Sequence, residues 1–410
     1  MLNPVRRVMF ATAAGLLAVS LMCMSPRLAA GQERLGAARI TLTASPAFES
    51  WSFSSGGLAQ PSLSGSSSVT LSSATQISIP LVISLPLFHD RWSLDLASGF
   101  ASNKVSLAST DDELETDNYS LSGITDTKIR IRGKLAGESV LLTAAVNVPT
   151  GATELDSEEL SALRVIAAPA LNFQVPQLGA GGGGTVGLVF GRQFDNWAWA
   201  LAGSYELRSG YTPISFASGI AAPDFNPGDV IHISLGGDGL VGQNGMSVAL
   251  SADIFSEDEL TSGGSAAPGS QLGPIFTAEW RMRFAAPRFQ ELSLSVVDRF
   301  RTPYKRDGET VDGSSGNYVD IGLLAAHSAS PRTTLTWEIS ARHHTGLKAD
   351  SSIISAAVAG AGLRLSVAHE LRGGTVVQPF AAVNFANFRN GDASGSATGI
   401  TLGLTVMKGW

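Results

Sequence analysis

The chain of 410 residues has one cysteine, few charged residues and, after its first thirty residues, no long apolar run. Cys23 lies in a segment that we expect to be removed, which leaves no disulfide, cysteine nucleophile or cysteine metal site in the exported chain. Charged residues make up only 15% of the chain, and a net charge of -7 with a pI near 5.4 argues against nucleic acid as a partner. No later apolar run approaches the roughly 20 residues of a membrane helix, which excludes a helical membrane protein.

The first residues have the three-part form of a secretory signal. Arg6 and Arg7 precede the apolar segment "VMFATAAGLLAVSLMCM", and the small residues Ala29 and Gly31 follow it. We expect a signal peptide over residues 1–31 and a mature chain from Gln32. Met22 stands where a lipoprotein signal has a small residue before its cysteine, so lipidation of Cys23 is not favoured. Residues 32–410 show no break in composition that resembles a linker, which predicts one large domain.

What the chain does have is alternation of polar and apolar residues. In "DTKIRIRGKL", Lys128, Arg130, Arg132 and Lys134 alternate with Ile129, Ile131 and Leu135. Side chains alternate faces along a strand, so this spacing predicts a ribbon that is cationic on one face and apolar on the other. The same pattern returns in "IFTAEWRMRFAA", "RTTLTWEISARHH", "NWAWALAGSYELRSG" and "LRLSVAHELRGG".

These segments have about the 10-residue length of membrane strands, and short connections broadly alternate with long ones. We predict an all-β fold, a closed antiparallel transmembrane β-barrel of about 16 strands with both termini in the periplasm; 14 strands remain possible. The predicted strands lie at 38–52, 67–87, 91–101, 126–135, 139–149, 163–175, 185–207, 229–236, 246–255, 274–286, 290–302, 317–329, 332–344, 355–371, 376–388 and 398–410. The segment 185–207 could instead be two strands about Asp195 and Asn196, but this breaks the alternation of loop lengths.

The sheet must close into a barrel, because unpaired backbone groups cannot face hydrocarbon. In a closed barrel one face of each strand meets lipid and the other meets the lumen. Each cation on a lipid face would cost about 2–4 kcal/mol at the midplane, so we expect the cations to face the lumen. The chain ends on Trp410, which fits the terminal aromatic signal read by the barrel insertion machinery of the outer membrane, although Lys408 replaces a second aromatic residue.

Residues 123–213 resemble the outer-membrane family named for the MetA pathway of phenol degradation, whose members are barrels similar to FadL-type hydrocarbon transporters. The resemblance rests on "GITDTKIRIRGKL", "LLTAAVNVPTGATELD" and "NWAWALAGSYELRSGYTP", and its most specific part is "NVPTG", with Asn147, Pro149, Thr150 and Gly151. It implies an outer-membrane channel for passive uptake of small, hydrophobic or aromatic solutes. The segment from Gln32 to Ala38 is too short to fill a wide barrel, so no FadL-like plug is predicted.

Nine cations are candidates for a partly cationic lumen: Lys128, Arg130, Arg132, Lys134, Arg164, Arg281, Arg283, Arg299 and Arg301. They can form a selectivity ladder for anionic solutes, as rings of charge do in pores. Alternatively they pair with Glu206, Glu279, Glu338 and Asp320 and stiffen the wall, and this structural interpretation is favoured for most of them. Lys128 to Lys134 are the favoured exception, because four like charges on one strand need more partners than their neighbours offer.

The remaining candidates carry weaker signals. Acidic residues of the external loops could bind divalent ions and bridge through them to lipopolysaccharide, or they could simply be solvated. Solvation is favoured, because none of them has the spacing of an EF-hand loop. They are Asp111, Asp112, Glu113, Glu115, Asp117, Glu154, Asp156, Glu158, Glu159, Glu257, Asp258 and Glu259. His343 and His344 lack an accompanying serine nucleophile motif, and the run Gly179 to Gly184 lacks the lysine of a phosphate loop. We therefore expect no enzyme, no cofactor and no metal site. Two alternatives stay open, a lipid-modifying barrel enzyme and a structural or adhesive barrel acting through its loops.

Overall fold

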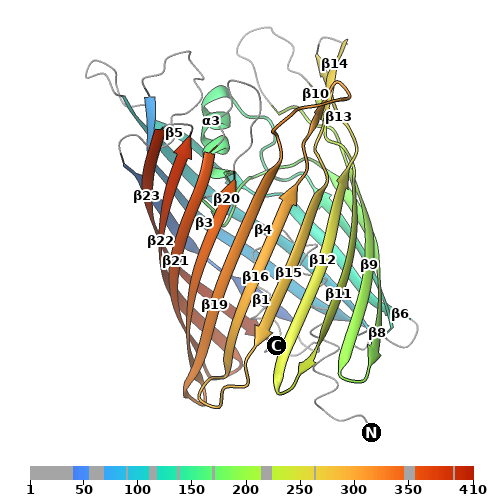
Figure 1. Cartoon of the computed structure of the whole chain (residues 1–410), viewed down its shortest axis with the longest axis vertical. Coiled ribbons are helices and arrows are strands. Elements are labelled where there is room, and N and C mark those ends of the chain that lie inside the picture. The colour runs from blue at the N-terminus through green and yellow to red at the C-terminus, as the bar shows by residue number, and fades with distance from the viewer. Residues whose placement is uncertain are drawn as a thin grey trace.

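A computed structural model describes residues 40–54, 69–88, 91–109, 118–135, 139–168, 171–213, 224–262, 265–345, 356–390 and 393–410. Eighteen strand segments form one antiparallel sheet, and β1 with β2 and β5 with β6 each occupy one position, so the barrel has sixteen strands (Figure 1). The segments are β1 Thr41–Ala44, β2 Ala47–Phe53, β3 Val69–Leu87, β4 Trp92–Ser109, β5 Asn118–Ile124, β6 Thr127–Leu135, β7 Val140–Val148, β8 Gly183–Phe194, β9 Trp197–Arg208, β11 Val230–Val241, β12 Asn244–Phe255, β15 Ile275–Arg283, β16 Glu291–Arg301, β19 Gly316–Ser330, β20 Thr333–Thr345, β21 Ala356–Glu370, β22 Thr375–Asn390 and β23 Ala393–Gly409.

The barrel closes between its first and last strands. Both β1 and β2 pair with β23 on one side and with β3 on the other, in one continuous register. Pro46, which has no N–H to donate, separates β1 from β2. Closure therefore satisfies the backbone groups of both strands that would otherwise form the edges of the sheet.

A second interruption changes the faces of a strand. β5 and β6 both pair with β4, but their registers differ by one residue, which marks a bulge at Thr125 and Asp126. Odd-numbered residues such as Leu121 point inward in β5, whereas even-numbered residues such as Arg130 point inward in β6. The bulge thus sets the inward direction of the predicted cationic ribbon.

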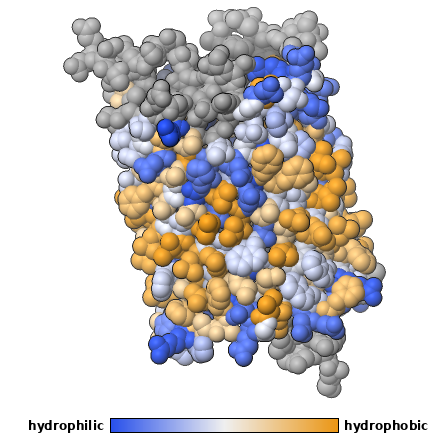
Figure 2. Space-filling model, in the orientation of Figure 1, coloured by the Kyte–Doolittle hydropathy of each residue, from blue (hydrophilic) through white to orange (hydrophobic). Residues whose placement is uncertain are grey.

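The burial pattern is the reverse of that of a soluble protein. Large apolar side chains on the outward faces are exposed, as in Ile77 at 52%, Leu188 at 53% and Leu250 at 60%, while polar side chains such as Gln76 are buried inside. Figure 2 shows apolar residues across the middle of the visible face of the barrel, with hydrophilic residues gathered toward both ends. Some exposed aromatic residues lie toward the short-turn end of the band, such as Phe88, Phe194, Phe284 and Trp410, and some toward its loop end, such as Tyr205, Phe276 and Phe300, while Phe48, Phe100 and Trp337 lie between the two ends. This apolar band is the lipid-facing surface of a transmembrane barrel.

The two ends of the barrel differ. Short turns join β3 to β4, β8 to β9, β11 to β12, β19 to β20 and β21 to β22 at one end, where the described chain also finishes at Trp410 (Figure 1). At the other end, a small sheet stands on the rim, formed by β10 Asp224–Asn226, β13 Asp258–Ser262, β14 Ser265–Gln271, β17 Lys305–Arg306 and β18 Glu309–Thr310. None of the described helices is long and apolar enough to cross a bilayer.

The predicted count of sixteen is right, but two of the predicted ranges are wrong. The described residues of 163–175 form no strand; they belong to the helix α3 Ser157–Ile166 and to irregular chain after it. Residues 185–207 are two strands, β8 and β9, joined at Asp195 and Asn196, where Asp195 has a φ of 46°. A two-residue hairpin needs such left-handed backbone, which Asp and Asn tolerate. The two errors cancel in the count, and the other fourteen predicted ranges each overlap one strand position.

Candidate functional site

The strand registers assign a side to each charged residue of the barrel wall. Because directly opposite residues share a face, the inward residues form continuous rows around the lumen. Inward cations and inward carboxylates occur in similar numbers on the described strands. The cations are Lys128, Arg130, Arg132, Lys134, Arg208, Arg281, Arg283, Arg299, Arg301, Arg342 and Arg364, and the carboxylates are Glu49, Asp95, Glu206, Asp238, Asp253, Glu279, Glu291, Asp320 and Glu338.

Part of the lumen is occupied by the connection between β7 and β8, residues 149–182, which we call the inserted segment. The Trp51 indole N–H donates to Leu171 O at 3.1 Å, and the Gln76 side chain donates to Val175 O and accepts from Val175 N at 2.7 and 2.8 Å. Gln174 donates to Ser45 O at 3.3 Å. Since Ser45 is four residues from the short-turn end of its strand and eight from Phe53, the inserted segment reaches past the middle of the barrel.

An apolar cluster joins the inserted segment to the inner wall. It combines residues of the segment with inward residues of seven strands, β2 to β5 and β21 to β23: Trp51, Phe53, Leu71, Ala74, Ala101, Val105, Leu107, Leu121, Leu155, Ala162, Val165, Ile166, Leu171, Phe173, Val175, Leu178, Val358, Ala386, Phe388 and Ala397. Burying side chains of this size stabilises the arrangement by about 1.5–3 kcal/mol for each large residue. The inserted segment is therefore packed against the inner wall through a shared apolar core.

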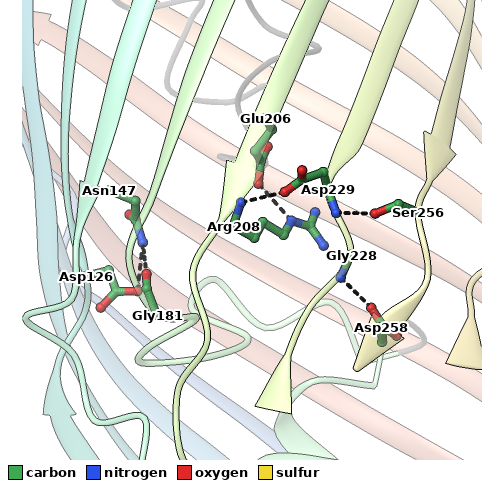
Figure 3. Close-up of polar contacts among 9 residues, drawn as sticks. All are labelled: Asp126, Asn147, Gly181, Glu206, Arg208, Gly228, Asp229, Ser256 and Asp258. Carbon is green, nitrogen blue, oxygen red and sulfur yellow. Dashed lines mark hydrogen bonds and ion pairs between the residues drawn. The ribbon is translucent and has the colours of Figure 1, made fainter. Parts of the chain in front are cut away.

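The motif "NVPTG" forms the neck of this segment (Figure 3). Asn147 donates to Asp126 at 3.0 Å and to Gly181 O at 2.6 Å, while the carboxylate of Asp126 also accepts from the backbone N–H groups of Gly151 and Ala180. A Cβ on Gly151 would lie 2.2 Å from Leu178 O, so only glycine fits between the two arms of the neck. The motif therefore has a structural role, since it directs the chain from the wall into the lumen.

The helix α3 begins at an acidic cap. Asp156 accepts from the N–H groups of Glu158 and Glu159, and Glu159 accepts from the N–H of Asp156, which is a capping box. These acidic residues thus have a local function in capping. Arg164 lies on the exposed face of α3, so its predicted place on a barrel strand is wrong.

The predicted cationic ribbon is partly neutralised. Arg130 and Arg132 both pair with Asp95 of β4, at 2.9 and 2.8 Å, and the Asp95 side chain is only 3% exposed. Lys128 and Lys134 lie on the same inward face, and Lys134 is exposed. The inward direction predicted for all four is confirmed by the register. The two central arginines, however, share one buried carboxylate, Asp95, which the sequence interpretation missed.

On the opposite wall, the structure separates the arginines into two groups. Arg281 pairs with Glu291, and Arg283 lies 3.8 Å from Asp238, both toward the short-turn end. Toward the loop end, Arg299 and Arg301 have no ion pair among the described residues, and neither does Arg342, which was not predicted as a site residue. Arg299 is exposed, so water reaches this part of the lumen.

The other sequence candidates have separate places. His343 points outward and His344 inward, because they are consecutive in β20, so they cannot act together at one site. Gly179 to Gly184 form the returning arm of the inserted segment and the start of β8. Residues 1–31 and the acidic residues Asp111 to Asp117 lie outside the described residues. Among the residues that are described, no group of three or more His, Cys, Asp or Glu is placed to hold a metal ion.

A polar network ties the strands together at the loop end (Figure 3). Asp229 accepts from Tyr205 Oη at 2.5 Å and from Arg208 N at 3.0 Å, and these hydrogen bonds hold the pKa of Asp229 below its usual value. Arg208 donates to Glu206, and Gly228 N donates to Asp258 at 2.7 Å. Asp258 of the predicted acidic loops therefore braces the rim, and Glu259 accepts from Asn226.

No protein-family model and no curated protein matches the chain, so the resemblance to the MetA-pathway family stays a prediction. Among solved structures, the chain is similar to OprB of Pseudomonas putida at low pH, with TM-score 0.45, 10% identity and coverage of 94% of this chain and 98% of that one. It is similar to OccK1 (OpdK) of Pseudomonas aeruginosa, with TM-score 0.44, 9% identity and coverage of 91% and 98%. It is also similar to the COG4313 outer membrane channel of Pseudomonas putida F1, with TM-score 0.36, 12% identity and coverage of 92% and 97%.

Proposed function

We propose that this protein is a passive outer-membrane channel for small solutes. The observation that carries the proposal is the combination of an apolar outer face with an inner wall whose charged side chains stay accessible to water beside the inserted segment. A barrel with only a structural role would need no inner wall in contact with water. Packed side chains could then fill the whole lumen, as they do on the side that contacts the inserted segment.

The orientation is part of the proposal. The end with short turns faces the periplasm, and the end that carries the small sheet and α3 faces outward. Residues 1–31 direct export, and Trp410 is read by the insertion machinery. The solutes that the family resemblance implies are small and hydrophobic or aromatic. The sequence predicted a partly cationic lumen, whereas the strands that the structure describes carry inward cations and inward carboxylates in similar numbers.

Purified protein reconstituted in planar bilayers tests the proposal. We expect discrete conductance steps in KCl, together with outer-membrane fractionation and a shift in gel mobility on heating, as a closed barrel gives. Recovery of the folded protein from the soluble periplasm would contradict the membrane assignment. A heat-modifiable barrel that never conducts ions would contradict the channel.

A further inference from the structure

The loop-end arginines lie on a compact inward patch of β16, β19 and β20, which are neighbours in the barrel wall (Figure 1). Arg299 is directly opposite Tyr318, and Tyr318 is directly opposite His344. One row nearer the short-turn end, Asp320 is directly opposite Arg342, and Arg301 lies one row nearer the loop end. Opposite residues have Cβ atoms about 4.5–5.5 Å apart, so these side chains share one patch, which we call the loop-end arginine site.

Two of the arginines extend over glycines. A Cβ on Gly316 would lie 3.6 Å from Arg301 Nη2, and a Cβ on Gly360 would lie 3.3 Å from Arg342 Cγ. Both side chains therefore lie against the wall beside a glycine, with the tighter contact at Gly360. Within the described part of the chain, Arg301 Nε and Arg342 Nη1 are buried without a hydrogen-bond partner. Buried donors of this kind need an acceptor, because leaving one unsatisfied is unfavourable.

The carboxylates near the patch have other partners. Asp320 accepts from Tyr318 Oη at 3.1 Å, Glu279 lies within electrostatic range of Arg299, and Asp253, in the same row as Arg301, pairs with His232. Among the described residues, Arg299, Arg301 and Arg342 form no ion pair. A monoanion with two acceptor oxygens would supply the acceptors that Arg301 and Arg342 lack.

We propose that the loop-end arginine site binds a small monocarboxylate at the loop-side entrance to the lumen. The carboxylate lies between the fork-shaped guanidinium groups of Arg301, on the loop-end side, and Arg342, on the short-turn side, and Arg299, on the row between them, adds positive charge. Ile275 and Val297, inward residues beside the arginines, offer an apolar surface for the rest of the molecule. The inference rests on the proposed channel function in that the bound carboxylate is the solute that then passes through the lumen.

Benzoate is a suitable probe, with acetate as a smaller carboxylate and benzyl alcohol as an uncharged molecule of similar size. Binding to the detergent-solubilised barrel is measured by titration calorimetry, and block of KCl current is measured in bilayers. The variant is Arg301→Gln/Arg342→Gln, with Arg342→Lys as the conservative change and Arg283→Gln, an inward arginine near the short-turn end, as the matched control.

We expect saturable benzoate and acetate binding in the wild type and none of benzyl alcohol. The double variant should bind benzoate at least about tenfold more weakly, because each charged hydrogen bond lost is worth about 1.5–3 kcal/mol. Arg342→Lys should fall between, and Arg283→Gln should match the wild type. Equal binding by the double variant, or equal weakening by Arg283→Gln, would overturn the site. If the wild type binds benzoate but does not conduct ions, the channel function is contradicted and the loop-end arginine site is supported. If it conducts ions but does not bind benzoate, the site is contradicted and the channel function is supported.

Discussion

The two sides of the lumen are built in opposite ways from strands whose outward faces are alike. On β2 to β5 and β21 to β23, apolar inward residues are covered by the inserted segment. The inward faces of β6, β12, β15, β16, β19 and β20 instead carry charged residues, of which Lys134 and Arg299 are exposed. The comparison teaches that alternation determines which face meets lipid but not what fills the inside. An apolar inner wall is stable here because the chain provides its own partner for that wall.

The largest effect is expected from removing the partner of the apolar side. Replacing residues 155–178 by a short Gly-Ser linker should raise the single-channel conductance roughly twofold or more, because the lumen loses its filling. Heat-dependent gel mobility checks that the barrel still closes. Shortening the rim hairpin at 305–310, which lies outside the lumen, is the control. An unchanged conductance after the first deletion would mean that the ions pass where the inserted segment does not lie.

A smaller effect is expected from a single substitution in the neck of the inserted segment. Gly151→Val places a side chain against Leu178 O and Asp126 N, so we expect a loss of about 2 kcal/mol or more in the free energy of unfolding, measured in urea. Gly184→Ala is the matched glycine variant, since its Cβ would meet only an ordinary contact at 3.7 Å. If both variants unfold at the same urea concentration, the neck does not hold the segment as described.

On the charged side, the buried carboxylate Asp95 should matter more than the partly exposed pair of Arg281 and Glu291. Asp95→Asn removes the carboxylate charge that pairs with both Arg130 and Arg132 and should cost about 3–5 kcal/mol of stability. Glu291→Gln breaks the half-exposed pair with Arg281 and should cost about 0–1 kcal/mol. Urea titrations of the two variants provide the comparison, and similar costs would show that burial does not separate the two pairs.

The smallest effect is expected from Lys128, an inward cation that forms no ion pair with the described residues. Lys128→Gln should lower the preference for anions over cations by less than about twofold, and only at low salt, because screening weakens single charges. Reversal potentials in a KCl gradient measure it. A large shift from this one substitution would show that the ribbon is the selectivity element and would weaken the case for the loop-end arginine site.

Periodicity predicted the closed barrel and the inward direction of the ribbon, since Ile129 and Ile131 could not otherwise face lipid. It failed for α3 because the apolar residues of "LSALRVIAAPALNFQV" were assigned to a strand, although Asp156 and Glu159 have the spacing of a capping box just before them. Periodicity also did not identify Asp95 as the partner of Arg130, because the two residues are 35 positions apart and an ion pair between distant residues leaves no pattern in the local sequence. Cross-strand contacts such as Arg301 over Gly316 depend on register, which the sequence does not state.

The closure between β1 and β23 has a further consequence. Trp410 N donates to Ile40 O at 3.0 Å, so the two ends of the described chain meet at one edge of the wall. The contact with the longest separation in sequence is thus the one that completes the barrel, and it cannot form before the last strand has been synthesised. Loop-closure entropy makes such a contact a late and slow event in assembly. The same proximity makes the chain a good subject for circular permutation, in which new ends are opened at a short turn and the original ends are joined.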